Sequence, residues 1–116
     1  MNRGYIIGNL VRDPESRTTS SGLVVVNATV ADNRRKKDGS ESVSFIDITL
    51  WDKRGEAFAR NHKKGDKVFV EGRYEMDSWE DKNGGGRRTK LKMQVENWEF
   101  VKGDAPARTA STPENF

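Results

Sequence analysis

The sequence of 116 residues predicts an all-β domain, a five-stranded Greek-key barrel with one short helix between strands three and four. Two observations predict this class. Apolar and polar residues alternate in most of the chain up to residue 101, which is the pattern of strands that bury one face. Clusters of turn-forming residues separate the alternating segments. Only residues 53–62 have a helical pattern instead.

Five segments have the alternation and composition of strands, and these are residues 3–11, 23–32, 44–51, 66–77 and 87–101. Gly8 predicts a kink in the first segment. The second is rich in β-branched residues, which favour strands. In the last segment the apolar positions change phase near Asn97, which predicts a bulge or a sharp bend.

The connections contain the residues that turns require. Gly, Asp and Ser occur in all three expected connections, residues 12–22, 36–42 and 78–86. In the second of them, Asp38-Gly39 is a strong hairpin signal. The expected helix, residues 53–62, is ended by Gly65. Three strands, a helix and two more strands follow the order of the OB-fold.

The third strand predicts a functional surface. Ile46, Ile48 and Leu50 form its apolar side, which we expect to face the barrel core. Phe45 and Trp51 then point outward, together with polar residues. Large aromatic side chains on a polar face are costly to leave in water, so a partner is expected there.

Trp79, in a polar hairpin, adds a third outward aromatic residue. Aromatic residues near basic ones suit single-stranded nucleic acid, because every base has a π-face and every linkage has a negative charge. The structural alternative is that Phe45 and Trp51 pack on the helix or a second subunit, and that Trp79 covers its own strand. We expect Trp98 and Phe100 in the core.

Basic side chains on the same loops and strands would contact phosphates. The expected contacts are Arg3, Arg34, Arg35, Lys36, Lys53, Lys64, Arg73, Arg87 and Arg88. The formal net charge of +3, from 21 basic and 18 acidic residues, is weak evidence by itself. The inference therefore depends on where the basic residues lie.

The composition excludes several classes of function. The chain has no cysteine, which excludes a disulfide framework, a thiolate zinc site and a cysteine nucleophile, and His62 is its only histidine. The longest apolar run, residues 23–26, is far shorter than the ~20 residues of a membrane span. We therefore expect a soluble, cytoplasmic, non-enzymatic protein with no cofactor and no metal.

Four motifs resemble those of the bacterial and phage single-stranded DNA-binding proteins and occur in the same order. They are residues 8–17 (GNLVRDPESR), residues 27–31 with 33–35 (NATVA, NRR), residues 64–65 with 68–73 (KG, VFVEGR) and residues 79–84 (WEDKNG). The resemblance covers residues 1–101. It implies an OB-fold that binds single-stranded DNA without sequence preference during replication, recombination and repair.

The same resemblance implies base stacking on Phe45, Trp51 and Trp79, and a homo-oligomer, with a tetramer favoured over a dimer. The chain departs from the family at four positions. Lys36 stands where the family has a further stacking tryptophan. Phe45-Ile46-Asp47 stand where the family usually has Trp-His-Arg. Asp47 would repel phosphate, and Ile46 lies at a position linked to subunit packing.

Residues 102–116 contain one aromatic residue and no periodic pattern, so we expect them to be a flexible tail after an OB-fold domain of residues 1–101. Family members commonly end in an acidic tip with a terminal Pro-Phe that recruits replication and repair proteins. Here the terminal Phe116 has a single acidic residue near it, Glu114. We expect at most a weak partner site at Phe116.

Two other functions stay open. A metal-dependent OB-fold nuclease would use carboxylates such as Asp47 and Asp52, although residues five positions apart on one continuous strand face opposite sides. A protein-interaction or RNA-binding barrel, such as an accessory protein of replication restart, would use the same fold.

Overall fold

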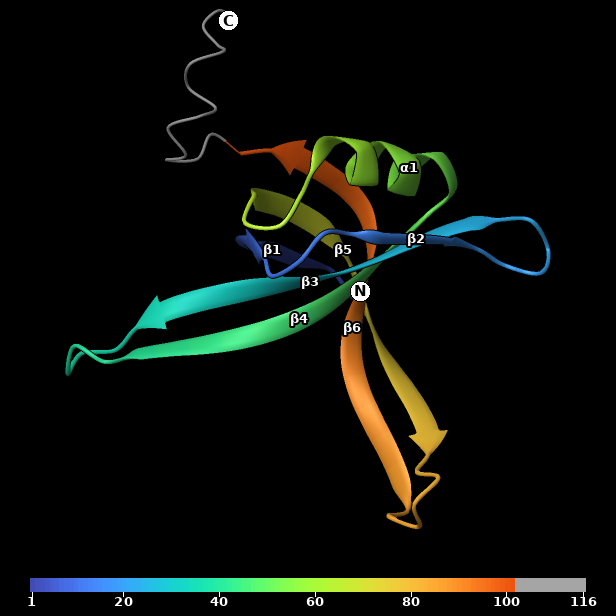
Figure 1. Ribbon diagram of the computed structural model, residues 1–116. Coiled ribbons are helices and arrows are strands. Elements are labelled where there is room, and N and C mark those ends of the chain that lie inside the picture. Colours follow the sequence, from blue (N-terminus) through green and yellow to red (C-terminus); the bar gives the residue numbers. More distant parts are fainter. Residues whose placement is uncertain (102–116) are drawn as a thin grey trace, which may run out of the picture.

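The computed structural model describes residues 1–101, which form six strands and one helix (Figure 1). The elements are β1 (Gly4–Leu10), β2 (Glu15–Thr18), β3 (Val24–Arg35), β4 (Glu41–Trp51), α1 (Asp52–Asn61), β5 (Lys67–Glu80) and β6 (Arg87–Phe100). No helix among these residues is long and apolar enough to cross a membrane. The expected tail and Phe116 lie outside the described residues.

Five of the strands close into a barrel. They follow one another in the order β1-β5-β6-β4-β3, and β1 returns to β3 through Asn9 opposite Ala31 and Leu10 opposite Val30. All neighbours are antiparallel except β4 and β6. The five predicted strands, the helix after the third of them and the OB-fold are confirmed.

The sequence did not predict β2, which lies outside the barrel on the edge of β3, with Glu15 opposite Asn27 and Thr18 opposite Val24. All four residues of β2 are exposed. A strand that buries no side chain has no apolar alternation to detect, and it forms through backbone hydrogen bonds to its neighbour. Four of the eleven residues in the predicted connection, residues 12–22, therefore form a strand.

The core fills the barrel and is covered at one end by α1. The apolar side of β4 is confirmed, because Ile48 and Leu50 are fully buried and Ile46 packs against the core. Phe58 of α1 is also fully buried. The chain enters α1 through Asp52, which has a φ of 57°, a left-handed conformation that Asp adopts more readily than most residues.

β6 contains one residue more than β5 needs. Glu71 lies opposite Asn97 and Gly72 lies opposite Val95, so Glu96 has no partner in the register. The predicted phase change near Asn97 is this bulge. A Cβ at Gly72 would lie 1.9 Å from the Gln94 carbonyl oxygen, so only glycine fits where the two backbones approach.

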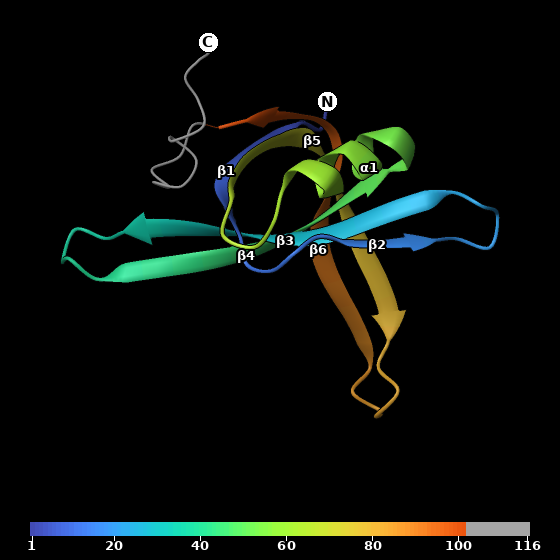
Figure 2. The same ribbon diagram turned by 45° about the horizontal axis from the view of Figure 1, so that its top comes forward.

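Three hairpins extend beyond the barrel, β2–β3, β3–β4 and β5–β6, and we call the last two arms (Figures 1 and 2). The β3–β4 arm comprises residues 32–44, and the β5–β6 arm comprises residues 76–91. Both keep a strand ladder far from the core, from Asp32 opposite Ser44 to Arg35 opposite Glu41 and from Met76 opposite Leu91 to Glu80 opposite Arg87. The arms point in different directions, with α1 on the opposite side of the barrel from the β5–β6 arm.

Candidate nucleic-acid interface

One face of the sheet points away from the core and carries the candidate site. We define this outer sheet face by the side chains that alternate with the core residues on β2 to β6. The strand registers place these residues side by side: Glu15, Arg17, Val25, Asn27, Thr29, Ala31, Phe45, Asp47, Thr49, Trp51, Arg73, Glu75, Asp77, Trp79, Arg88, Lys90, Lys92 and Gln94.

The three predicted stacking residues all belong to the outer sheet face. Phe45 and Trp51 lie on β4 and are 60% and 41% exposed. Trp79 lies on the β5–β6 arm opposite Arg88 and is 47% exposed. Their outward direction is confirmed, so three large aromatic side chains share one surface over β4 and the β5–β6 arm.

Trp98 and Phe100 were both expected in the core, and the structure confirms this only for Trp98. Trp98 is partly buried and packs against the core. Phe100 was expected in the core, but it is 66% exposed. It points to the core side of β6 at the open end of the barrel, where its ring stacks on His62 with centroids 5.5 Å apart and meets Trp98 edge-on. One side of Phe100 therefore has no covering layer.

Several of the basic residues that were expected to contact phosphates are paired with carboxylates instead. Arg3 bonds to Glu71 at 2.7 Å and also to Glu96, which pairs in addition with Arg73 at 3.3 Å. The hydrogen bonds from Arg3 hold the pKa values of Glu71 and Glu96 below their usual range. Arg3 is therefore part of a surface ion-pair network beside the bulge.

The basic residues of the two arms each form fewer ion pairs than Arg3 does. Arg34 and Arg35 pair with Asp32 and Glu41 at 3.2 and 3.5 Å, and both arginines are largely exposed. On the other arm, Arg88 pairs with Asp81 at 3.0 Å. Exposed pairs of this kind contribute little stability and exchange readily with other anions.

Four further predicted cations have no carboxylate partner within the described part of the chain. Lys36 lies in the turn of the β3–β4 arm, and Lys53 lies in α1 two residues after Trp51. Arg87 bonds to the hydroxyl of Ser78 on the opposite face of its arm from Arg88. Lys64 lies in the α1–β5 loop, where its backbone N–H donates to Asp13, so the structure does not place it on the outer sheet face.

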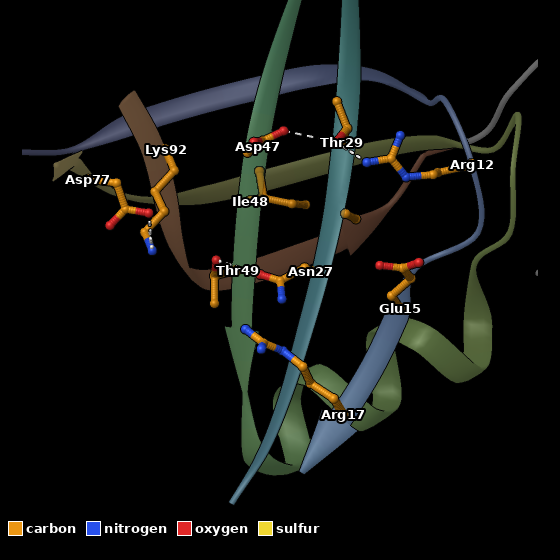
Figure 3. Close-up of a pocket in the computed structure, with 11 residues that line it drawn as sticks. Arg12, Glu15, Arg17, Asn27, Thr29, Asp47, Ile48, Thr49, Asp77 and Lys92 are labelled. Carbon is orange, nitrogen blue, oxygen red and sulfur yellow. Dashed lines mark hydrogen bonds and ion pairs between the residues drawn. The ribbon is translucent and has the colours of Figure 1, made fainter. Parts of the chain in front are cut away.

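The structure adds two arginines that the sequence did not single out. A groove of about 220 Å³ crosses the outer sheet face (Figure 3), and its lining includes Arg12 and Arg17. Among residues 1–101, neither arginine has an ion-pair partner, and Arg12 bonds only to the hydroxyl of Thr29 at 3.4 Å. Residues 12–22 were expected to be a connection, so no face could be assigned to either side chain.

Asp47 lies at the floor of this groove and is neutralised by its neighbours. Its carboxylate contacts Lys90 Nζ at 2.7 Å and accepts a hydrogen bond from Thr29 at 2.9 Å. Partial burial raises the pKa of Asp47, but the bonds from Lys90 and Thr29 and the charge of Arg12 outweigh it, so the pKa lies below its usual value. The positive charge of Lys90 beside Asp47 thus offsets the repulsion of phosphate that was expected from this carboxylate.

The two carboxylates of the nuclease alternative are separated by the fold. Asp47 is bound to Lys90 on the sheet, whereas Asp52 begins α1. In residues 1–101, no group of three or more His, Cys, Asp or Glu side chains is arranged to hold a metal ion.

The sequence is similar to that of several proteins named single-stranded DNA-binding protein. One from Synechocystis is 34% identical over 119 residues, which cover all of this chain and 98% of the relative. One from Helicobacter hepaticus is 42% identical over 86% of this chain and 61% of the relative, and one from Thermus thermophilus is 37% identical over 72% and 32%. The chain thus matches nearly the whole of the first relative and less than two thirds of the other two. The model of the single-strand binding protein family matches residues 1–101, and the chain belongs to that family.

Proposed function

We propose that the protein binds single-stranded DNA along the outer sheet face without sequence preference. The observation that carries the proposal is the alignment of Phe45, Trp51 and Trp79 on one surface that contains exposed basic residues. Stacking on an aromatic ring accepts any base, and a basic groove follows the backbone whatever the sequence. The names of the relatives support the same activity.

The proposed contacts divide into two kinds. The bases stack on the three aromatic side chains. The phosphates meet cations that have no carboxylate partner in the described chain, of which Arg12, Arg17, Lys36 and Lys53 flank the aromatic residues or lie at an arm tip. Arg34, Arg35, Arg73 and Arg88 join them by exchanging their carboxylate partners for phosphate.

Binding of this kind holds single strands open and shields them from re-annealing and nucleases during replication, recombination and repair in the cytoplasm. We propose binding rather than catalysis, because the surface offers stacking and charge neutralisation, while the Asp47 carboxylate contacts Lys90 and Thr29. An accessory protein of replication restart is the alternative, and it would retain the fold but bind single strands weakly.

We further propose that the chain acts as a homo-oligomer, with a tetramer favoured over a dimer. Among residues 1–101, the stretch of β1 from Gly4 to Gly8 pairs only with β5, so its other edge has no strand partner there. Tyr5 and Ile7 are exposed beside this edge, and Tyr5 stacks on Phe69 with centroids 6.0 Å apart. A free edge next to exposed apolar side chains suits pairing with a second copy.

Labelled oligonucleotides test the proposal. Incubation with a dT oligomer and with a duplex of equal length, each with and without Mg²⁺, distinguishes the three candidate functions. Retention of the single strand without cleavage supports the proposal. Mg²⁺-dependent cleavage indicates the nuclease, and the absence of retention indicates the accessory protein. Light scattering with and without the dT oligomer gives the number of copies in the complex.

A further inference from the structure

Trp51 is held by a buried amide. Its indole Nε1–H donates to Gln94 Oε1 at 2.9 Å, and Gln94 lies opposite Thr49, one step along the ladder between β4 and β6. Gln94 is only 9% exposed, although it belongs to the outer sheet face. An indole N–H can only donate, and Gln94 is the acceptor that the structure provides for it.

A second bond fixes which way the amide points. Gln94 Nε2 donates to Glu75 Oε1 at 2.8 Å. Trp51 can only donate and the Glu75 carboxylate can only accept, so both partners require the same orientation of the Gln94 amide. Flipping the amide would place two donors together at Trp51 and two acceptors together at Glu75.

We infer that Gln94 is a positioning residue for DNA binding, because it holds the Trp51 ring in one orientation with a face open to a base. This rests on the proposed function of the outer sheet face. A large ring that is already ordered loses little freedom when a base stacks on it, whereas a free ring must first be immobilised. Gln94 acts only through Trp51 and touches no DNA.

The expected effect follows from the cost of ordering one side chain. Gln94→Met keeps the length of the side chain and removes both hydrogen bonds. We expect affinity for a dT oligomer to fall roughly two- to tenfold. In a Trp51→Phe background, which has no indole N–H to hold, we expect the same substitution to change the affinity by less than twofold.

A spectroscopic readout separates positioning from general loosening. The three indole N–H resonances are assigned with Trp51→Phe and Trp79→Phe in the full-length chain. Gln94→Met is expected to shift the Trp51 resonance and speed its exchange with water, and to leave those of Trp79 and Trp98 in place. If Gln94→Met does not fold, Gln94→Thr replaces it, because threonine suits a strand and its hydroxyl is too short to reach the indole.

Exchanging the two groups is expected to restore binding. In the double variant Glu75→Gln with Gln94→Glu, the carboxylate accepts from Trp51 and the amide donates to that carboxylate, with no change in net charge. Affinity is expected to return to within twofold of that of the starting protein. The Trp51 resonance is expected to return close to its original position. The matched control is Asn97→Ala, which removes a hydrogen bond from β6 to Glu71 away from Trp51.

The outcomes separate this inference from the proposed function. Equal losses for Gln94→Met in both backgrounds, or no loss in either, would overturn the inference while DNA binding stands. Failure of the unmodified protein to bind a dT oligomer would overturn the proposed function and the inference together. If Trp51→Ala leaves affinity unchanged, stacking at Trp51 is absent and the role of Gln94 fails with it.

Discussion

Lys90 and Asp47 form a 2.7 Å ion pair between β6 and β4 in the middle of the outer sheet face. The pair places a carboxylate where a phosphate would compete for the same ammonium group. Asp47 also accepts a bond from Thr29, so its carboxylate keeps one hydrogen-bond partner if Lys90 turns to a phosphate. On the proposed interface, a phosphate would therefore have to compete with Asp47 for Lys90.

Asp47→Asn is expected to tighten binding to single strands, because it frees Lys90 for phosphate. One additional phosphate contact steepens the plot of log affinity against log salt by about 0.7 for a single strand. Titration of a fluorescent dT oligomer at several salt concentrations measures this. Glu56→Gln, the same type of charge change on α1, is the control and should leave the slope unchanged. Weaker binding by Asp47→Asn would show that the carboxylate itself contacts the DNA.

Trp51→Ala and Trp79→Ala are each expected to weaken binding by ~1–3 kcal/mol, the range for loss of one stacked base. This is roughly a five- to 150-fold loss of affinity. Trp98→Ala is expected instead to destabilise the fold by about 3 kcal/mol, the low end for a core truncation, because Trp98 is only partly buried. Affinity titrations and thermal melts of the three variants separate the roles. A large loss of affinity for Trp98→Ala with little loss of stability would place the binding surface elsewhere.

Arg3→Gln is expected to affect stability more than DNA affinity, since Arg3 is engaged by Glu71 and Glu96. Bonds from Arg3 lower the pKa of both carboxylates in the folded state. Their contribution is therefore present above the unfolded pKa of Glu, about 4.3, and is lost as the pH falls through the lower folded values. Melting temperatures of the two proteins should differ at pH 7 and converge near pH 3. A difference that persists at pH 3 would contradict this origin.

Binding to single strands is expected to exceed binding to duplex at ~0.15 M salt and to weaken steeply as salt rises, because phosphate contacts release counterions. Comparison of dT, dC and mixed-sequence oligomers should show little preference. Equal affinity for duplex and single strand would remove stacking as the basis of binding, since paired bases offer no free face.

Removal of residues 103–116 is expected to leave melting temperature and DNA affinity nearly unchanged. This segment contains Arg108 against Asp104 and Glu114, so its net charge is small, and it has no core-forming pattern. A large fall in melting temperature after truncation would show that the folded unit extends past residue 101.

Periodicity was enough to predict the barrel because most of its strands bury one side. The alternation of Ile46, Ile48 and Leu50 assigned both faces of β4 and so the direction of Phe45 and Trp51. The pattern could not reveal β2, since none of its side chains is buried. It also could not reveal the partners of surface charges. Arg3 and Arg34 look alike in sequence, but only the fold brings two carboxylates to Arg3 and one to Arg34.

Glu96, which has no partner in the register, changes which residues of β6 face the core. Before Glu96, odd-numbered residues such as Met93 and Val95 point to the core. After it, an even-numbered residue, Trp98, points to the core. On β5, the even-numbered residues lie on the core side throughout. If Glu96 were instead paired in a regular ladder, with no bulge, every second residue along the whole of β6 would lie on the same side. Either Trp98 would swing out of the barrel, or Lys90, Lys92 and Gln94 would turn inward and leave Trp51 without its acceptor. The bulge at Glu96 therefore keeps Met93, Val95 and Trp98 on the core side of β6 while Gln94 and the lysines before it stay on the outer sheet face.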